Sequence, residues 1–206
     1  MVVNSCFFSV TPHSQISNDS TANACQLTIR AADKRDLHRL AQLLSDSFHP
    51  PEGLKALLYP FLKLGIHEDL RSRIKSSSPD YICLVAVAPV FTAAGKREEV
   101  AGTIEMTLSS SNIWLRGRNR STYISNLAVH PSYRRQGIAR KLLRRCEQTT
   151  LEWGFKEISL HVLEDNHQAR QLYLSSGYQL RRFEPSCSAW FFQRPRRLLL
   201  HKRMSN

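Results

Sequence analysis

The chain has 206 residues, of which 42% are hydrophobic and 22% charged, proportions typical of one globular domain with or without a tail. It has no run of the roughly 18–20 apolar residues that a membrane-spanning helix needs, and its five cysteines form no CxxC pair, which argues against an integral membrane protein, a zinc ribbon and a disulfide scaffold. Twenty-nine basic and seventeen acidic residues give a net charge of +12, which favours an anionic partner such as nucleic acid, an acidic protein surface or a phosphorylated cofactor.

The first 26 residues differ in composition from the rest of the chain. They are rich in Ser, Thr and Asn, contain no Lys or Arg, and carry one acidic residue, Asp19. We interpret residues 1–26 as a disordered leader; a transit peptide is the alternative, although it should also carry Arg. We therefore expect a cytoplasmic protein, or a protein of the plastid stroma if the leader is part of a transit peptide.

From Gln26 onward, the hydrophobic pattern predicts strands and helices that alternate along the chain. In chain order, we expect a strand at 26–30, a helix at 36–48 with Asp33 as its N-cap, a helical region at 54–74 interrupted by Pro60, strands at 81–91, 100–108 and 123–129, a helix at 137–153, a strand at 156–163, a helix at 166–175, and a terminal pair of strands starting at 177 and at 197. This alternation predicts an α/β (α+β) fold in which helices cover a sheet, with one domain over 27–204.

The most informative segment is the predicted junction between the strand at 123–129 and the helix at 137–153. The first N–H groups of a helix have no intrahelical acceptor and lie at the positive end of the helix dipole. Gly137 lets an anion approach this backbone closely, and Arg134, Arg135 and Arg140 add positive charge. The junction therefore predicts a pyrophosphate site. An ordinary basic, solvated helix start is the alternative.

Two sequence blocks resemble the GNAT superfamily of acetyl-CoA-dependent N-acetyltransferases. Residues 134–139, Arg-Arg-Gln-Gly-Ile-Ala, match the family signature [RQ]-x-x-G-x-[GA] after a strand. Residues 166–178 match a second block, in which Asn, Ala, Leu-Tyr and Gly-Tyr follow at the expected spacing. The resemblance covers roughly 26–204. It implies a central mixed, mostly antiparallel twisted sheet of about seven strands with helices on both faces, acetyl-CoA as co-substrate, and no metal.

The resemblance also implies roles for individual residues. A strand segment would hydrogen-bond the pantetheine arm, the loop would hold the pyrophosphate, and the second block would contact the arm and carry the proton donor to the leaving thiolate, Tyr173. The cofactor-binding residues expected in this way are Leu127, Ala128, Val129, Arg134, Arg135, Gln136, Gly137, Ile138, Ala139, Arg140, Asn166, Ala169 and Tyr173. A backbone N–H near Ala128 could stabilise the oxyanion of the tetrahedral intermediate.

Three residues are candidates for removing the proton of the acceptor amine. Glu105 lies on a predicted strand and could point into the cleft; a solvent-facing carboxylate is its alternative interpretation. Tyr123 and His161 resemble the strand Tyr and strand His that hold the catalytic water in one branch of eukaryotic N-terminal acetyltransferases. Histidine suits this task because its ordinary pKa is roughly 6.5. A packing tyrosine and a buried strand histidine are the alternatives.

The resemblance thus implies an N-acetyltransferase in which an amine attacks acetyl-CoA directly. The longer pattern is similar to plastid and cyanobacterial GNAT proteins, which implies that the acceptor is a protein N-terminal α-amine, a lysine ε-amine, or both. Acetylation of a small amine is an alternative, but the basic charge of the chain counts against a cationic substrate. A non-enzymatic, basic nucleic-acid-binding module is a second alternative. We expect no membrane partner, and nucleic acid is not the expected partner.

Overall fold

A seven-stranded sheet, with strand order β1-β2-β3-β4-β5-β7-β6, organises the part of the chain that the computed structural model describes, residues 27–48, 59–76, 78–93, 95–110, 120–184 and 195–204. The predicted leader lies outside these residues. The strands are β1 (Thr28–Ala31), β2 (Tyr81–Thr92), β3 (Gly95–Ser110), β4 (Arg120–Val129), β5 (Glu157–Leu163), β6 (Gln179–Glu184) and β7 (Arg197–Arg203). The helices are α1 (Leu37–Phe48), α2 (Tyr59–Ser76), α3 (Ile138–Glu152) and α4 (His167–Ser175), and a short 3-10 turn, η3 (Pro131–Tyr133), follows β4.

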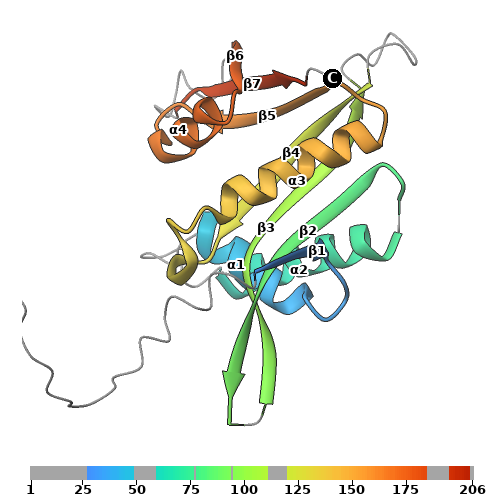
Figure 1. Cartoon of the computed structure of the whole chain (residues 1–206), viewed down its shortest axis with the longest axis vertical. Helices are drawn as coiled ribbons and strands as arrows, with labels where there is room; N and C mark the ends of the chain where they lie inside the picture. The colour runs from blue at the N-terminus through green and yellow to red at the C-terminus, as the bar shows by residue number, and fades with distance from the viewer. Residues whose placement is uncertain are drawn as a thin grey trace, which may run out of the picture.

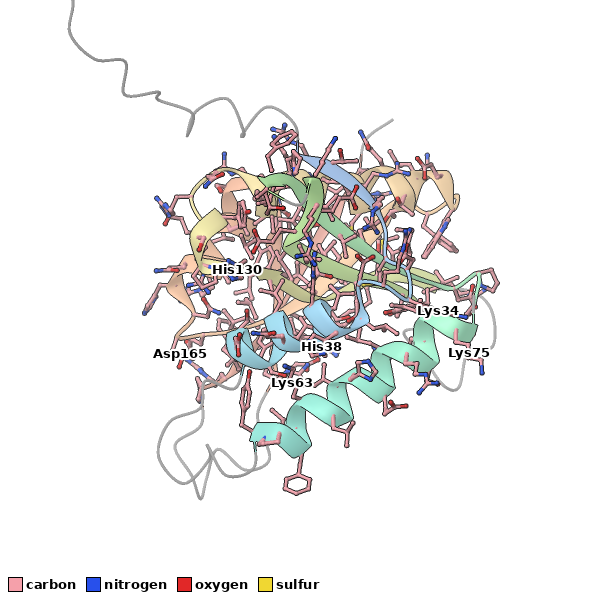
Figure 2. All side chains as sticks on the ribbon, turned by 90° about the horizontal axis from the view of Figure 1, so that it is seen from below. Lys34, His38, Lys63, Lys75, His130 and Asp165 are labelled. Carbon is pink, nitrogen blue, oxygen red and sulfur yellow. The ribbon has the colours of Figure 1, made fainter. Side chains whose placement is uncertain are left out.

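Helices cover both faces of the sheet, and each face has its own hydrophobic core. In Figure 1, α3 crosses the face turned toward the viewer, and α4 lies by the end that carries β5 and β7. We call the core on this face the α3–α4 core; it includes Ile124, Leu142 and Leu160. The opposite α1–α2 core includes Leu40 and Leu70. Figure 2 shows α1 and α2 side by side.

The amphipathic pattern of α3 explains its position on the sheet. Ile138, Leu142 and Cys146 recur every four residues and are buried, together with Leu143. Burying one such side chain stabilises the fold by about 1.5–3 kcal/mol. The predicted helix and its inward face are therefore confirmed, and Gly137 is its N-cap.

The predicted fold class is confirmed, but some boundaries differ. β3 begins at Gly95 rather than at residue 100, because the Lys96–Glu99 segment pairs with β2 at the end of a long hairpin. Both faces of that end are exposed, so its charged residues carry no hydrophobic alternation that would reveal a strand. Pro60 does not interrupt α2. It lies in the first turn, where a missing N–H breaks no helical hydrogen bond. The start of the predicted region, residues 54–58, lies outside the described residues.

β4 and β5 run side by side for only a short distance. They pair in parallel from Thr122–Ile158 to Ile124–Leu160. β4 then continues to Val129 and β5 to Leu163 with no further pairing between them in the described structure. The carboxyl-terminal halves of the two strands therefore diverge, and we call the region between them, which one unpaired edge of β4 faces, the opening.

A β-bulge in β4 lies at the start of this opening. Ser125 is paired with Glu105 and Ala128 with Thr103, so two residues of β4 face the single residue Ile104 of β3. Asn126, in the bulge, has a φ of 51°, in the left-handed region. A shift of one residue exchanges the two faces of a strand. Accordingly, Ile124 packs in the α3–α4 core, whereas Ala128 packs in the α1–α2 core.

Candidate active site

The backbone of β4 beyond the bulge has a defined orientation. The N–H of His130 donates to the carbonyl of Ala101 on β3 at 2.9 Å. Because backbone groups alternate along a strand, Ala128 also faces β3, and Leu127 and Val129 face the opening. The carbonyl of Val129 agrees with this, since it accepts from the Arg134 side chain at 3.1 Å. The amides available in the opening therefore belong to Leu127 and Val129 rather than to Ala128.

The loop after β4 presents a row of backbone amides. Arg135 and Gly137 have positive φ angles of 64° and 77°, which turn the chain sharply into α3. The N–H groups of Tyr133 and Arg134 donate to the carbonyls of His130 and Pro131, and the next N–H with a protein acceptor in the described structure is that of Lys141, which donates to the Gly137 carbonyl at 3.1 Å. The six N–H groups of residues 135–140 have no acceptor among the described residues.

Space is open in front of these amides. A Cβ added to Gly137 would meet no atom within 4 Å. Unpaired N–H groups at a helix N-terminus, with room before them, form an anion site of the kind that binds a diphosphate. The pyrophosphate of acetyl-CoA fits this chemistry, and we call residues 134–140 the cradle.

The basic side chains of the cradle differ in how they are held. Arg134 is fixed by its hydrogen bond to Val129, and Arg140 donates to the Ser175 hydroxyl at 2.9 Å. Gln136 donates to the Ser132 carbonyl at 3.3 Å. Arg135 is exposed and has no partner among the described residues. In the described structure, Arg135 is thus the cradle arginine without a hydrogen-bond partner, whereas Arg134 and Arg140 each have one.

Tyr123 and His161 meet on the α1–α2 face of the sheet. Their strand neighbours Ile124, Leu160 and Val162 pack in the α3–α4 core, so alternation turns both side chains to the opposite face. The Tyr123 hydroxyl and His161 Nδ1 are hydrogen-bonded at 2.9 Å. The pair lies just where β4 and β5 begin to separate.

Glu184, at the end of β6, extends this pair, and no motif in the sequence marks it. Its Oε2 lies 2.9 Å from His161 Nε2, within ion-pair distance but outside hydrogen-bond alignment. Its other oxygen accepts from Arg182 at 2.6 Å. Arg182 is the main cause of a lowered pKa at Glu184, so this carboxylate is ionised at neutral pH. Burial raises the pKa of Tyr123, which keeps its phenol neutral.

Glu105 is fully buried, with 0% of its surface exposed, and therefore does not face solvent. One carboxylate oxygen accepts from Arg73 of α2 at 3.0 Å, and the other accepts from the amide of Asn126 at 2.8 Å. Both oxygens are thus held by protein donors beneath the bulge, and the side chain does not meet Tyr123 or His161 in any hydrogen bond of the described residues.

Tyr173 lies on α4 and packs in the α3–α4 core, so it approaches the opening from the face opposite to Tyr123 and His161. It is 7% exposed, and its ring packs edge-to-face against Tyr178 at 5.9 Å between centroids. Burial, with a smaller contribution from the neighbouring Tyr123, raises the pKa of Tyr173 to about 12. The side chain is therefore a neutral phenol that can donate a proton at physiological pH.

Asn166 has a structural contact in addition to the role that the resemblance implies. It is the N-cap of α4, and its Oδ1 accepts from the N–H of Ala169 at 3.1 Å. This bond occupies the oxygen of the carboxamide and leaves the Nδ2 donor. Ala169 packs against the edge of the α3–α4 core.

A cysteine nucleophile does not fit the described part of the chain. Cys83 and Cys146 are buried, and burial raises the pKa of both thiols, so neither is ionised at neutral pH.

The described residues include no group of three His, Cys, Asp or Glu that could hold a metal ion. Among the described helices, none is both long and apolar enough to span a bilayer.

Comparison with known proteins agrees with this geometry. The sequence matches the Acetyltransferase (GNAT) family over residues 37–178. It is 32% identical, over 178 residues, to GCN5-related N-acetyltransferase 10, chloroplastic, of Arabidopsis thaliana, a match that covers 84% of this chain and 70% of the relative. It is 33% identical, over 114 residues, to the thialysine N-epsilon-acetyltransferase of Bos taurus, covering 54% of this chain and 64% of that protein.

The fold is also similar to solved structures. The structure of Arabidopsis thaliana NAA60 in complex with acetyl-CoA superposes with a TM-score of 0.63, at 19% sequence identity, and covers 88% of this chain and 100% of that one. The sequence match, the sheet with its open β4–β5 junction, and the cradle lead to one assignment: the chain belongs to the Acetyltransferase (GNAT) family and is an N-acetyltransferase that uses acetyl-CoA.

Proposed function

We propose that the chain acetylates protein amines, at N-terminal α-amines and lysine ε-amines. The observation that carries this proposal is the Tyr123–His161 pair at 2.9 Å, on the face opposite to Tyr173. The residues correspond to the strand Tyr and strand His of the N-terminal acetyltransferases that the sequence resembles. The name of the thialysine relative records transfer to an Nε amine, which supports an ε-amine as acceptor, and the assay below distinguishes a protein lysine from a small amine.

Acetyl-CoA would bind along β4 and the cradle. The amides of residues 135–140 would hold the diphosphate, with Arg134, Arg135 and Arg140 adding charge. The Leu127 carbonyl and the Val129 N–H, on the edge of β4 that faces the opening, would pair with the pantetheine arm. The Leu127 N–H would then lie where negative charge develops on the thioester carbonyl oxygen. Asn166 keeps its Nδ2 group, which can donate to the pantetheine arm.

The acceptor amine would approach from the α1–α2 face. An α-amine has an ordinary pKa of roughly 7.7–8.0 and a lysine roughly 10.4, so at neutral pH the amine must lose a proton before attack. A water molecule would take this proton and pass a proton to the Tyr123 hydroxyl, which would give its own proton to Nδ1 of His161, and the ionised Glu184, beside Nε2, would stabilise the imidazolium. Glu105 suits this task less well, because both of its oxygens are already held.

An acetylation assay with mixed acceptors tests the proposal. The full chain would be incubated with acetyl-CoA and three acceptor pools: peptides with a free α-amine, blocked peptides with one lysine, and small amines including thialysine and a polyamine. We expect acetylation in both peptide pools, located by mass spectrometry. Product from the small amines alone would reject a protein acceptor in favour of the small-amine alternative.

The role of His161 predicts a characteristic pH dependence. For a peptide α-amine, His161→Ala should lower kcat/KM by about 10-fold or more near pH 6.5, where the amine is protonated. The loss should shrink toward about pH 9.5, because above its pKa of roughly 8 the amine is already neutral. The measurement is a pH–rate profile of both proteins.

The exposed His38, on α1, provides the matched control (Figure 2). His38→Ala should follow the profile of the unchanged protein at every pH. An equal loss for His161→Ala across the whole range would assign His161 a structural role instead of proton acceptance.

For the cellular location, we propose the plastid stroma, because the relative with the longest match given above is named chloroplastic. The acid-poor residues 1–26, rich in Ser and Thr, would then belong to a transit peptide. Sequencing the N-terminus of the protein purified from fractionated cells tests this: an intact Met1 in the cytosolic fraction would support the cytoplasmic alternative.

A further inference from the structure

The buried carboxylate of Glu105 lies directly beneath the bulge of β4. An ionised carboxylate with no exposed surface is very unfavourable unless it is paired and hydrogen-bonded. Here Arg73 supplies the pairing charge at 3.0 Å, and Asp69, on the same helix, holds Arg73 in turn at 2.8 Å. The ion pair therefore links α2 to β3 through side chains with defined positions.

The second partner of Glu105 is the bulge itself. Asn126 has a φ of 51°, a conformation that side chains other than Gly, Asn and Asp rarely adopt. Its amide donates to Glu105 Oε1 at 2.8 Å. This hydrogen bond fixes the carboxamide, and with it the left-handed turn, against a carboxylate that cannot move because Arg73 holds its other oxygen.

The conformation of Asn126 determines which backbone N–H groups of β4 face the opening. Without the additional residue of the bulge, alternation would turn the backbone groups of Leu127 and Val129 toward β3 and those of Ala128 toward the opening. We propose that Glu105 is a positioning residue: through Asn126 it holds the bulge, and the bulge aims the Leu127 N–H at the oxygen that gains charge during transfer. This inference rests on the proposed function of the opening as the acyl-transfer site.

Four variants test the proposal, with kcat and acetyl-CoA affinity measured for each. Asn126→Ala, which lacks the carboxamide, should lower kcat by about 10-fold or more, because small displacements of an oxyanion donor have large effects on rate. Asn126→Gly, which adopts positive φ freely, should recover part of this loss. Acetyl-CoA affinity should fall less than kcat does, because the diphosphate contacts lie on the separate cradle.

Substitutions of Glu105 separate positioning from proton transfer. Glu105→Leu removes the acceptor for Asn126 and should reduce kcat as Asn126→Ala does. Glu105→Gln keeps an oxygen that can accept from Asn126 but cannot act as a base, and it should recover most of the loss. Equal inactivity of Glu105→Gln and Glu105→Leu would overturn the proposal and identify Glu105 as the proton acceptor.

A second readout does not depend on turnover or on the proposed acceptor. In a ¹H–¹⁵N spectrum of the ¹⁵N-labelled protein, Asn126→Ala and Glu105→Leu should shift the amide resonances of Leu127 and Val129, and Glu105→Gln should leave them close to their original positions. Unchanged resonances in all variants would overturn the proposal. Absence of acetyl transfer by the unsubstituted protein, with the resonances shifted as expected, would reject the proposed acceptors while retaining the link between Glu105 and the bulge.

Discussion

Tyr173→Phe should lower kcat by about 100-fold or more, with acetyl-CoA affinity within about twofold of the original. The ring would stay in place, packed against Tyr178 in the α3–α4 core, so only the proton donor is lost. The leaving thiolate belongs to a thiol with a pKa of roughly 8.5, and a neutral phenol can protonate it. With a pKa of about 12, the Tyr173 hydroxyl is available over the whole neutral range.

Tyr178 offers a matched control for this experiment. It is the other ring of the same edge-to-face pair, it is 2% exposed, and its hydroxyl is buried with no hydrogen-bond partner among the described residues. Tyr178→Phe should therefore leave kcat within about twofold of the original, since removal of an unsatisfied hydroxyl leaves no partner behind. Equal kcat values for Tyr173→Phe and Tyr178→Phe would exclude Tyr173 as the acid.

The fold could be predicted from the sequence where local patterns decide the structure. The apolar spacing of α3 and the Gly137 N-cap lie within a few residues of each other, so periodicity and turn chemistry identify them directly. The same holds for the cradle, since unpaired amides follow from any helix start that lacks a side-chain cap. Gly137, the N-cap of α3, has no side chain that could accept a hydrogen bond from these amides.

The site could be predicted only in part, because several of its contacts depend on long-range pairing. Glu184 lies near His161 because β7 pairs with both β5 and β6 and so brings these two strands together. Local periodicity does not reveal this strand order. Glu105 is on a strand whose alternation shows on which face of the sheet its side chain lies. The alternation does not show which helix packs on that face. The hydrogen-bond donor to Glu105, Arg73, is 32 positions away, on a helix. The bulge at Asn126 has no glycine to mark it, so the sequence alternation does not reveal that the amides of Leu127 and Val129, rather than that of Ala128, face the opening.

Gly137→Val should abolish measurable binding of acetyl-CoA, the second large effect that the structure predicts. The added side chain would enter the open space before the amides of the cradle, where the diphosphate is expected. The readout is thermal stabilisation. For the unsubstituted protein, acetyl-CoA at 100 times its Kd should add about 2.7 kcal/mol to the free energy of unfolding. For Gly137→Val, the same ligand concentration should add almost nothing.

Backbone strain is a competing explanation, because Gly137 has a φ of 77°, and a side chain in this region costs about 1–2 kcal/mol. Gly154, directly after α3, separates the two effects. It has a φ of 82°, and a Cβ there would also meet nothing within 4 Å, so Gly154→Val carries a similar strain at the other end of the helix. Both variants should therefore unfold at similarly lowered temperatures, but only Gly154→Val should be stabilised by acetyl-CoA. Full stabilisation of Gly137→Val would show that the diphosphate binds elsewhere, and the acyl-transfer geometry proposed for β4, which depends on the cradle, would have to be rejected with it.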